Sequence, residues 1–280
     1  MSDIILEDNI GVKIGRLSNF KDGKERFPIE TWKSELKLIH NLNIKKIDWS
    51  ISKDSFFQNP IFYNQNTTQL FSLLSKYNLS INSIILDFII QNPFWRFNGK
   101  ERDTIENSFY LCIESCFKQN IKKIVFPILE NSKLKNKSES VEILLFFKNL
   151  ESLLKKYNLQ ILLETDFNPK FYKTFLSNLN FKYFKVCYDT GNSAGNFFDI
   201  EEEFNLYGDY IESIHIKDKN KNNNSVTLGE GLCDFVKFSK LIKDYDYKGN
   251  FIFESFKKIP LFENLELQIK FFKSKVLEIL

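Results

Sequence analysis

The chain has 280 residues, of which 43% are hydrophobic and 16% aromatic, and this composition excludes a disordered protein. Its 39 basic and 36 acidic residues give a net charge of only +3. Because the basic residues form no stripe or polybasic arm, we expect neither a nucleic acid nor a membrane surface as a partner.

The compartment follows from the N-terminus and the cysteines. The first ten residues, MSDIILEDNI, lack a basic start and a long apolar stretch, so no signal peptide is predicted. No apolar run approaches the ~18 residues of a membrane span. The four cysteines form no CxxC motif, and Cys112 and Cys116 stand one helical turn apart, which favours packing over a thiol metal pair. A cytoplasmic protein is the expectation.

Strand and helix signals alternate along the whole chain. In the first half, strands are predicted at residues 11–18, 44–52, 80–88 and 121–129, and helices at 28–43, 67–78, 101–119 and 138–157. In the second half, strands are predicted at 159–164, 183–189, 210–218 and 249–255, and helices at 169–179, 200–207, 234–245 and 261–276. Eight strand–helix units without a linker predict an α/β fold, a single (β/α)8 TIM barrel domain over residues 1–280.

Two predicted loops are longer than a plain barrel connection needs. They follow the third strand (89–102) and the seventh strand (219–231), and both lie on the face where barrels keep their chemistry. Phe94 and Trp95 in the first loop predict either a pocket wall or ordinary packing. The Asn- and Lys-rich residues 219–224 predict a solvated loop.

Four successive strand-like runs end on side chains that can bind a metal: Glu164, Asp189, His215 and Glu254. Side chains alternate along a strand, so His215 and Lys217 share one face, as do Cys187 and Asp189. The carboxyl ends of neighbouring parallel strands meet at one barrel mouth, where three carboxylates would be costly without a cation. A divalent-metal site is therefore predicted. Oxygen-rich ligation with one imidazole suits Mn²⁺, Co²⁺ or Mg²⁺, and Zn²⁺ is also compatible.

Six short motifs carry a resemblance to a known group: GRLS (15–18), FP (27–28), YDTGN (188–192), HIKD (215–218), LGEG (228–231) and FES (253–255). Together they resemble the sugar phosphate isomerase/epimerase group of the xylose isomerase-like TIM barrel superfamily. Ketose 3-epimerases, hydroxypyruvate isomerases, inosose dehydratases and endonuclease IV are relatives in that superfamily. The resemblance covers essentially the whole chain and is firmest from Glu164 to Glu254.

The resemblance implies an enzyme, a metal-dependent isomerase or epimerase of a sugar, sugar phosphate or related polyhydroxy ketone. It implies that Glu164, Asp189, His215 and Glu254 hold one divalent metal ion. Proton transfer would pass through a metal-bound enediolate, with Glu164 and Glu254 as the catalytic pair. The expected partner is a small carbohydrate, and a homo-oligomer is compatible with the sequence.

Five further residues are predicted to bind substrate: Arg16, Asp87, Asn192, Lys217 and Glu230. Four of them have an alternative interpretation. Arg16 could form a salt bridge of the barrel, Lys217 could balance nearby carboxylates, Asn192 could form a turn with Gly191, and Glu230 could be a loop residue.

Three more residues near or away from the mouth complete the predictions. Asp48, like Asp87, is predicted to contact a substrate hydroxyl, and Trp49 is predicted to pack outward. His40 lies within a predicted helix, away from the mouth, and is interpreted as structural or exposed.

Two alternatives to an isomerase remain. A dehydratase of an inosose-like ketone would use the same site and the same first proton abstraction. A non-catalytic sugar-binding barrel would need no opposed pair of glutamates. DNA repair of the endonuclease IV type is disfavoured, because the chain contains only two histidines for a zinc cluster.

Overall fold

Eight parallel strands close into a barrel in the computed structural model, which describes residues 8–20, 25–62 and 65–279. Around the barrel the strands follow the order β1-β10-β7-β6-β5-β4-β3-β2. Their bounds are β1 Ile10–Lys13, β2 Lys46–Ser50, β3 Ser80–Ile85, β4 Lys123–Ile128, β5 Gln160–Thr165, β6 Phe184–Asp189, β7 Ile211–Ile216 and β10 Asn250–Phe253. The predicted (β/α)8 barrel is confirmed. The prediction that there is no signal peptide rests on residues 1–10, and most of these lie outside the described residues.

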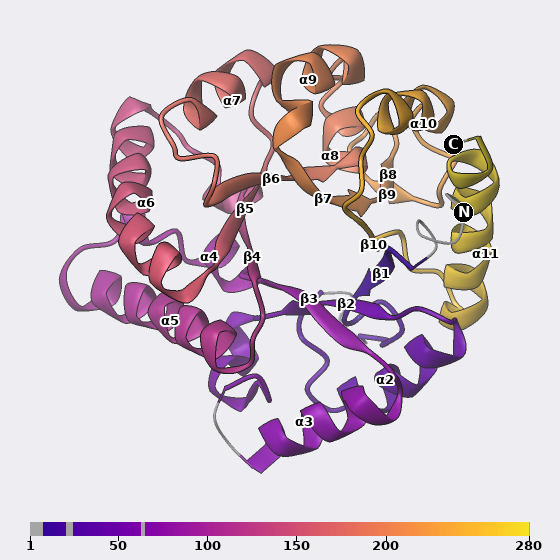
Figure 1. The fold of residues 1–280 in the computed structure, drawn as a ribbon, viewed down its shortest axis with the longest axis horizontal. Helices are drawn as coiled ribbons and strands as arrows, with labels where there is room; N and C mark the ends of the chain where they lie inside the picture. The colour runs from indigo at the N-terminus through magenta and orange to yellow at the C-terminus, as the bar shows by residue number, and fades with distance from the viewer. Residues whose placement is uncertain (1–7, 21–24, 63–64, 280) are drawn as a thin grey trace.

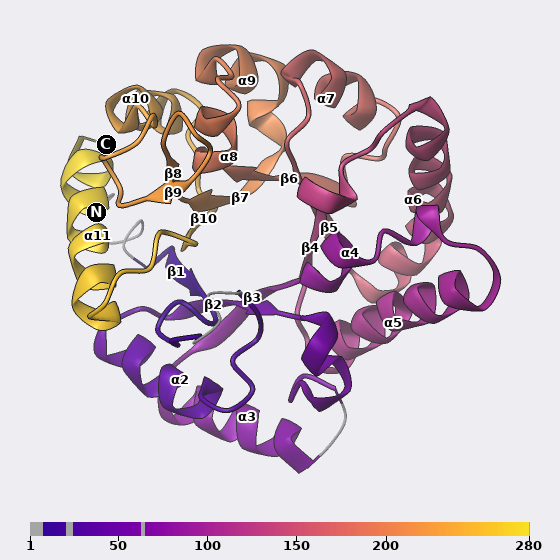
Figure 2. The same ribbon diagram turned by 180° about the vertical axis from the view of Figure 1, so that it is seen from behind.

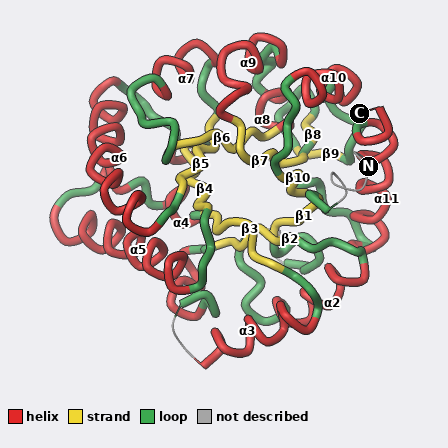
Figure 3. Tube along the Cα trace, viewed as in Figure 1, coloured by secondary structure: helices red, strands yellow, loops and turns green. Residues whose placement is uncertain are grey.

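A ring of helices surrounds the strands (Figures 1 and 3). One long helix follows each barrel strand: α2 Trp32–Asn41, α3 Gln65–Lys76, α5 Gly99–Lys118, α6 Lys137–Tyr157, α7 Pro169–Leu176, α9 Ile200–Tyr207, α10 Phe235–Asp244 and α11 Leu261–Lys275. Several begin at a residue whose side chain accepts a backbone N–H, among them Asn136 for α6 and Asn168 for α7. Pro169 then occupies the first turn of α7, where its missing N–H costs nothing.

The apolar residues form two separate cores. The larger, aromatic core fills the space between strands and helices. The smaller core consists of Ile85, Val125, Leu162 and Cys187, from four neighbouring strands. Because side chains alternate along a strand, Leu162 and Cys187 share a face with the strand-end residues that follow two positions later. An apolar layer in the barrel interior therefore underlies a polar mouth.

The first and third strands end earlier than predicted. β1 stops at Lys13 because Gly15, with φ of +100°, starts a turn, so Arg16 lies in that turn rather than on the strand. β3 stops at Ile85, and Asp87 begins a short helix, α4 (Asp87–Gln91). Figure 2 shows the ring from behind, with α4 beside β4.

The connections at the mouth contain short elements that were not predicted. Residues 190–195 form the helix α8 (Thr190–Gly195), and the loop after β7 contains a small antiparallel hairpin of β8 (Asp218–Lys219) and β9 (Ser225–Val226). Residues 220–224 between these two strands are exposed or partly exposed, as predicted for a solvated loop.

Several side chains take the packing role that the sequence left open. Phe94 is fully buried against Phe146, with ring centroids 4.4 Å apart, and Trp95 stacks on Phe126. Trp49 faces outward and meets Trp32 of α2.

Three other predictions concern a histidine and two cysteines. His40 is exposed on α2. Cys112 and Cys116 are buried free thiols in α5, consistent with packing. Within the described ranges, no helix combines the length and apolar character that crossing a membrane requires.

Candidate metal centre

The four predicted metal ligands converge at the barrel mouth. Glu164, Asp189 and His215 lie at or near the ends of β5, β6 and β7, and Glu254 follows directly after β10. Asp189 pairs with His215 in the register of β6 and β7. One ligand atom from each of the four residues can be chosen so that all lie within 4.8 Å of one another. That spacing is short enough for the four groups to share one ion.

Three atoms of this cluster are buried and have no hydrogen-bond partner among the described residues: Asp189 Oδ2, His215 Nδ1 and Glu254 Oε2. All four side chains belong to residues no more than 6% exposed. His215 Nδ1 lies 3.2 Å from Glu254 Oε2 and 3.6 Å from Glu164 Oε1. The charge nearest to Asp189 Oδ2 is Lys217 Nζ, at 3.9 Å. Buried polar atoms normally find a hydrogen-bond partner, so three such atoms in one cluster fit the donor set of a divalent cation.

The other atoms of these side chains are held in place by neighbours. His215 Nε2 lies 3.3 Å from Asp48 Oδ2, and Asn82 donates to the other oxygen of Asp48 at 2.7 Å. An ionised carboxylate only accepts, so this contact places a proton on Nε2 and leaves Nδ1 as the ring nitrogen that faces Glu164 and Glu254. Asp189 Oδ1 accepts the backbone N–H of Asn192 at 2.7 Å and thereby caps α8. The orientation of the free atoms is therefore fixed by the fold.

Two lysines flank one side of the cluster. Lys13 Nζ lies 3.0 Å from Glu254 Oε1 and 3.2 Å from Asp87 Oδ1, and Lys217 Nζ lies 3.6 Å from the same Glu254 oxygen. Burial alone would raise the pKa of Glu254, but the two ammonium charges outweigh it and hold that pKa well below its usual range.

The pKa of Glu164 shifts in the opposite direction. Burial raises its pKa, with a further contribution from the charges of Glu254 and Asp189, and the opposing charge of His215 does not cancel these effects. The two glutamates at the centre thus stand in different electrostatic environments.

The structure brings four of the five predicted substrate-binding residues to the mouth. Lys217 and Asp87 reach the cluster through the contacts described above. Asn192 donates to Glu164 Oε1 at 3.4 Å and lies in the short helix α8, which fits the turn interpretation, and its contact with substrate stays a prediction. Arg16 is buried beside the mouth, where it donates to the carbonyl of Ser255 at 3.2 Å.

Glu230 takes the alternative position. It is exposed in a turn, and the neighbouring backbone N–H groups of Gly229 and Gly231, at 2.9 and 3.0 Å, anchor that turn to Asp218 Oδ2. The LGEG motif is therefore explained by two amides that hold the loop.

Lys13 and Lys219 were missed as residues of the site. Lys13 stands two positions after Gly11 on β1, and strand alternation alone could have placed it at the mouth. Lys219 donates to the Asn192 side-chain oxygen at 2.8 Å. Asp48 was predicted to contact substrate, but it is fully buried and contacts His215 instead.

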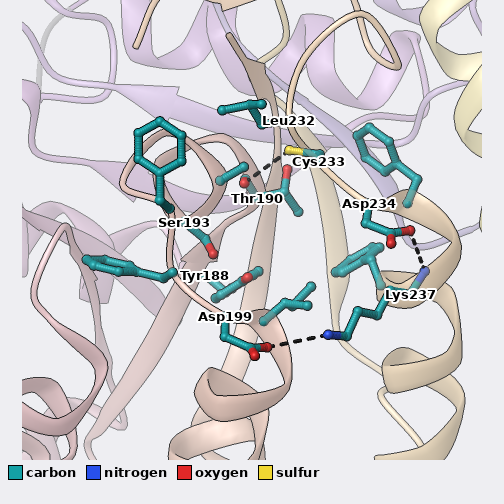
Figure 4. A pocket seen from close by; sticks show the side chains of 14 residues that line it. Tyr188, Thr190, Ser193, Asp199, Leu232, Cys233, Asp234 and Lys237 are labelled. Atoms are coloured by element: carbon teal, nitrogen blue, oxygen red, sulfur yellow. Dashed lines mark hydrogen bonds and ion pairs between the residues drawn. The ribbon is translucent and has the colours of Figure 1, made fainter. Parts of the chain in front are cut away.

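A cavity of about 340 Å³ lies between α8, α9 and α10 (Figure 4). None of the four candidate metal ligands lines it. Cys233 lies in its wall and donates to the carbonyl of Thr190 at 3.2 Å. The two carboxylates at this cavity cap helices: Asp199 caps α9 and Asp234 caps α10. Its charged groups are thus accounted for by the fold.

The xylose isomerase-like TIM barrel family model matches residues 36–275, so the chain belongs to that family. A protein from Haemophilus influenzae named as the L-ribulose-5-phosphate 3-epimerase SgbU is 36% identical over 83 residues, which are 27% of this chain and 29% of that protein. The match thus spans less than a third of this relative.

Two solved structures share the fold over nearly the whole chain. A D-psicose 3-epimerase determined in the presence of D-fructose has a TM-score of 0.74 at 10% identity and covers 96% of this chain and 99% of its own. A xylose isomerase-like TIM barrel protein from Mycobacterium smegmatis, in complex with magnesium, has a TM-score of 0.68 at 14% identity, with 96% and 97% covered.

Proposed function

We propose that this protein is a divalent-metal-dependent isomerase or epimerase of a sugar, sugar phosphate or related polyhydroxy ketone. The observation that carries the proposal is the set of three buried atoms, one each on Asp189, His215 and Glu254, that have no hydrogen-bond partner in the described part of the chain. With Glu164 they would hold one ion, for which Mn²⁺, Co²⁺ and Mg²⁺ suit the donor set and Zn²⁺ is compatible. The family and the named epimerase relative support the same reaction class.

When bound, a divalent cation would polarise the substrate carbonyl and stabilise negative charge beside it. Glu164 and Glu254 would then transfer the protons. One carboxylate removes the proton from the carbon next to the carbonyl, and the other returns a proton. Return to the opposite face of the same carbon gives an epimer, whereas return to the neighbouring carbon gives an aldose–ketose isomer.

The remaining residues of the mouth would position the substrate. Asn192 and Asp87 offer hydrogen-bonding groups for hydroxyls, and Lys217 and Arg16 offer positive charge. Glu230 stays a prediction, on its exposed turn. The buried cluster also excludes bulk water from the proton being moved, because each of its four residues is nearly inaccessible.

Deuterium wash-in tests the proposal directly. Protein loaded with each of the four metals is incubated in D₂O with a panel of ketoses, ketose phosphates and polyhydroxy ketones, and the products are analysed by NMR and mass. We expect deuterium at a carbon next to the carbonyl of at least one substrate. Loss of one water from the product would instead identify a dehydratase, and no deuterium across the panel would contradict proton transfer at this site.

Glu254→Gln is the informative variant. It removes a proton-transfer group while keeping the side-chain shape, so exchange should fall by on the order of 10³-fold. The matched control is Glu212→Gln, because Glu212 is a part-buried glutamate of the next strand, β7, paired with Lys123 at 2.6 Å. Equal loss in both variants would mean that the glutamates act through stability and not through chemistry.

A further inference from the structure

Arg16 is a buried cation beside the barrel mouth. The residue is 5% exposed, and its Nε atom is buried without a hydrogen-bond partner among the described residues. Nη1 donates to the carbonyl of Ser255 at 3.2 Å, and Nη2 pairs with the carboxylate of Glu25. A guanidinium presents its N–H groups as a fork that matches an oxyanion, so an unpaired N–H points to an anionic ligand.

Arg16 belongs to a group of cations on one side of the metal centre, which we call the cationic wall: Lys13, Arg16, Lys217 and Lys257. Lys257 Nζ donates to the carbonyls of Gly15 and Ser18, on either side of Arg16, at 3.4 and 3.3 Å. Burial, reinforced by the charge of Arg16, lowers the pKa of Lys257 to about 8. The wall is therefore crowded with positive charge.

Metal binding would increase this imbalance. Lys13 pairs with Glu254 at 3.0 Å and with Asp87 at 3.2 Å, and Lys217 lies 3.6 Å from Glu254 and 3.9 Å from Asp189. Of these carboxylates, Glu254 and Asp189 are also predicted metal ligands. A divalent cation at the centre would take up much of the negative charge of the cluster. The two lysines would then lack a full counter-charge, which favours a substrate that brings its own anion.

Glu25 marks where such an anion would lie. It belongs to the connection between β1 and α2, and its side chain is 49% exposed although it covers a buried arginine. Its charge acts on Lys13 and Lys217 as well as on Arg16. Glu35, by contrast, is 1% exposed and accepts the N–H groups of Gly15 and Leu17. Glu25 is thus a half-exposed partner of Arg16, whereas Glu35 is buried and held by backbone donors.

We propose that the cationic wall binds an anionic group of the substrate, a phosphate or a carboxylate, through Arg16. In the ligand-free protein the Glu25 carboxylate pairs with Arg16, and the substrate anion displaces it. This inference rests on the proposed function of the site and narrows the substrate class to anionic polyhydroxy ketones.

Anion binding by isothermal titration calorimetry tests the inference without turnover. The full chain, supplied with Mg²⁺, is titrated with inorganic phosphate and separately with D-gluconate, and the anion that binds identifies phosphate or carboxylate. Glu25→Gln should bind that anion about tenfold more tightly, if Glu25 holds Arg16 about nine-tenths of the time. Arg16→Gln should weaken binding by about tenfold or more.

Glu142→Gln is the matched control, because Glu142 pairs with Arg102 on α5 and α6, where no site is proposed. It should leave both titrations unchanged. Equal affinities of the parent and Glu25→Gln, or no binding of either anion to Glu25→Gln, would overturn the inference. If Arg16→Gln does not fold by circular dichroism, the Glu25→Gln result decides alone.

The outcome is separable from that of the proposed function. Deuterium exchange with neutral ketoses, together with no anion binding, would support the isomerase proposal and contradict the proposal of an anionic substrate. Anion binding that responds to Glu25→Gln, without exchange on any ketone, would support the anion site and remove the isomerase.

Discussion

The two ends of the barrel contain the same kinds of polar residue, but they differ in how completely those residues are hydrogen-bonded. At the amino-terminal end of the strands, Lys46 donates to Asn9 Oδ1 at 2.8 Å and to Asn250 Oδ1 at 2.5 Å. Lys123 pairs with Glu212 at 2.6 Å. At the carboxyl end, Asp189, His215 and Glu254 each keep one buried atom without a hydrogen-bond partner among the described residues.

This difference fits the proposal that residues of the opposite end stabilise the barrel and residues of the mouth serve chemistry. A paired lysine or asparagine closes the bottom of the barrel, where conserved polarity in this fold usually serves stability. At the top, Glu254 and Asp189 each have one paired oxygen and one buried oxygen without a hydrogen-bond partner among the described residues, and a bound cation would supply that partner. The proposed site therefore differs from the opposite end in the pairing of its atoms.

The largest expected effect comes from removing the imidazole of the centre. A metal that binds only the folded state stabilises it by about 2.7 kcal/mol when present at 100 times its Kd. We expect thermal unfolding of the parent to shift upward with at least one of Mn²⁺, Co²⁺, Mg²⁺ and Zn²⁺. His215→Gln should lose that shift, whereas Glu212→Gln at the opposite end should keep it. A parent protein that responds to none of the four metals would contradict the comparison.

Glu35→Ala tests whether a satisfied carboxylate near the mouth is structural. Glu35 accepts the N–H groups of Gly15 and Leu17 and the hydroxyl of Ser18, so its removal leaves buried donors unpaired. We expect a loss of about 2 kcal/mol in the free energy of unfolding, measured in urea. The exposed neighbour Glu30, changed to Ala, should alter it by no more than about 0.5 kcal/mol. Equal effects would show that Glu35 does not hold the loop.

Asp48→Asn has a smaller effect, on metal affinity. Asp48 orients His215 through Nε2, and partners of this type change metal affinity by roughly 10- to 100-fold. We expect a loss of about tenfold by calorimetric titration of the metal. An unchanged affinity would mean that His215 is oriented without its carboxylate neighbour.

The smallest effect concerns pH and Lys257. Burial and the charges of Arg16 and Lys13 lower its pKa to about 8 in the fold, although Glu25 and Glu35 partly oppose this. Between about pH 8 and the ordinary lysine pKa of 10.5, the unfolded chain therefore holds more protons at this group than the fold does, so the stability that it contributes rises with pH. Relative to Lys257→Met, the parent should gain stability across this window in urea unfolding. A difference that is independent of pH would contradict the lowered pKa.

The sequence alone determined the barrel and the convergence of the four candidate ligands. Alternating strand and helix signals predict parallel strands, and parallel strands bring their carboxyl ends to one mouth. The two-residue period then puts Glu164 above Leu162 and Asp189 above Cys187, facing inward. These are local rules, so they need no knowledge of neighbours distant in the chain.

The tertiary structure decided which partner each charged side chain contacts. Lys13 and Glu254 are 241 residues apart, and only closure of the barrel between β1 and β10 brings them to 3.0 Å. Asp48 reaches His215 across the barrel interior, 167 residues away. The turn at Gly15 places Arg16 beyond the end of β1, where it contacts Ser255 and Glu25. A strand pattern fixes the face on which a side chain lies, whereas its partner depends on the packing of the whole chain.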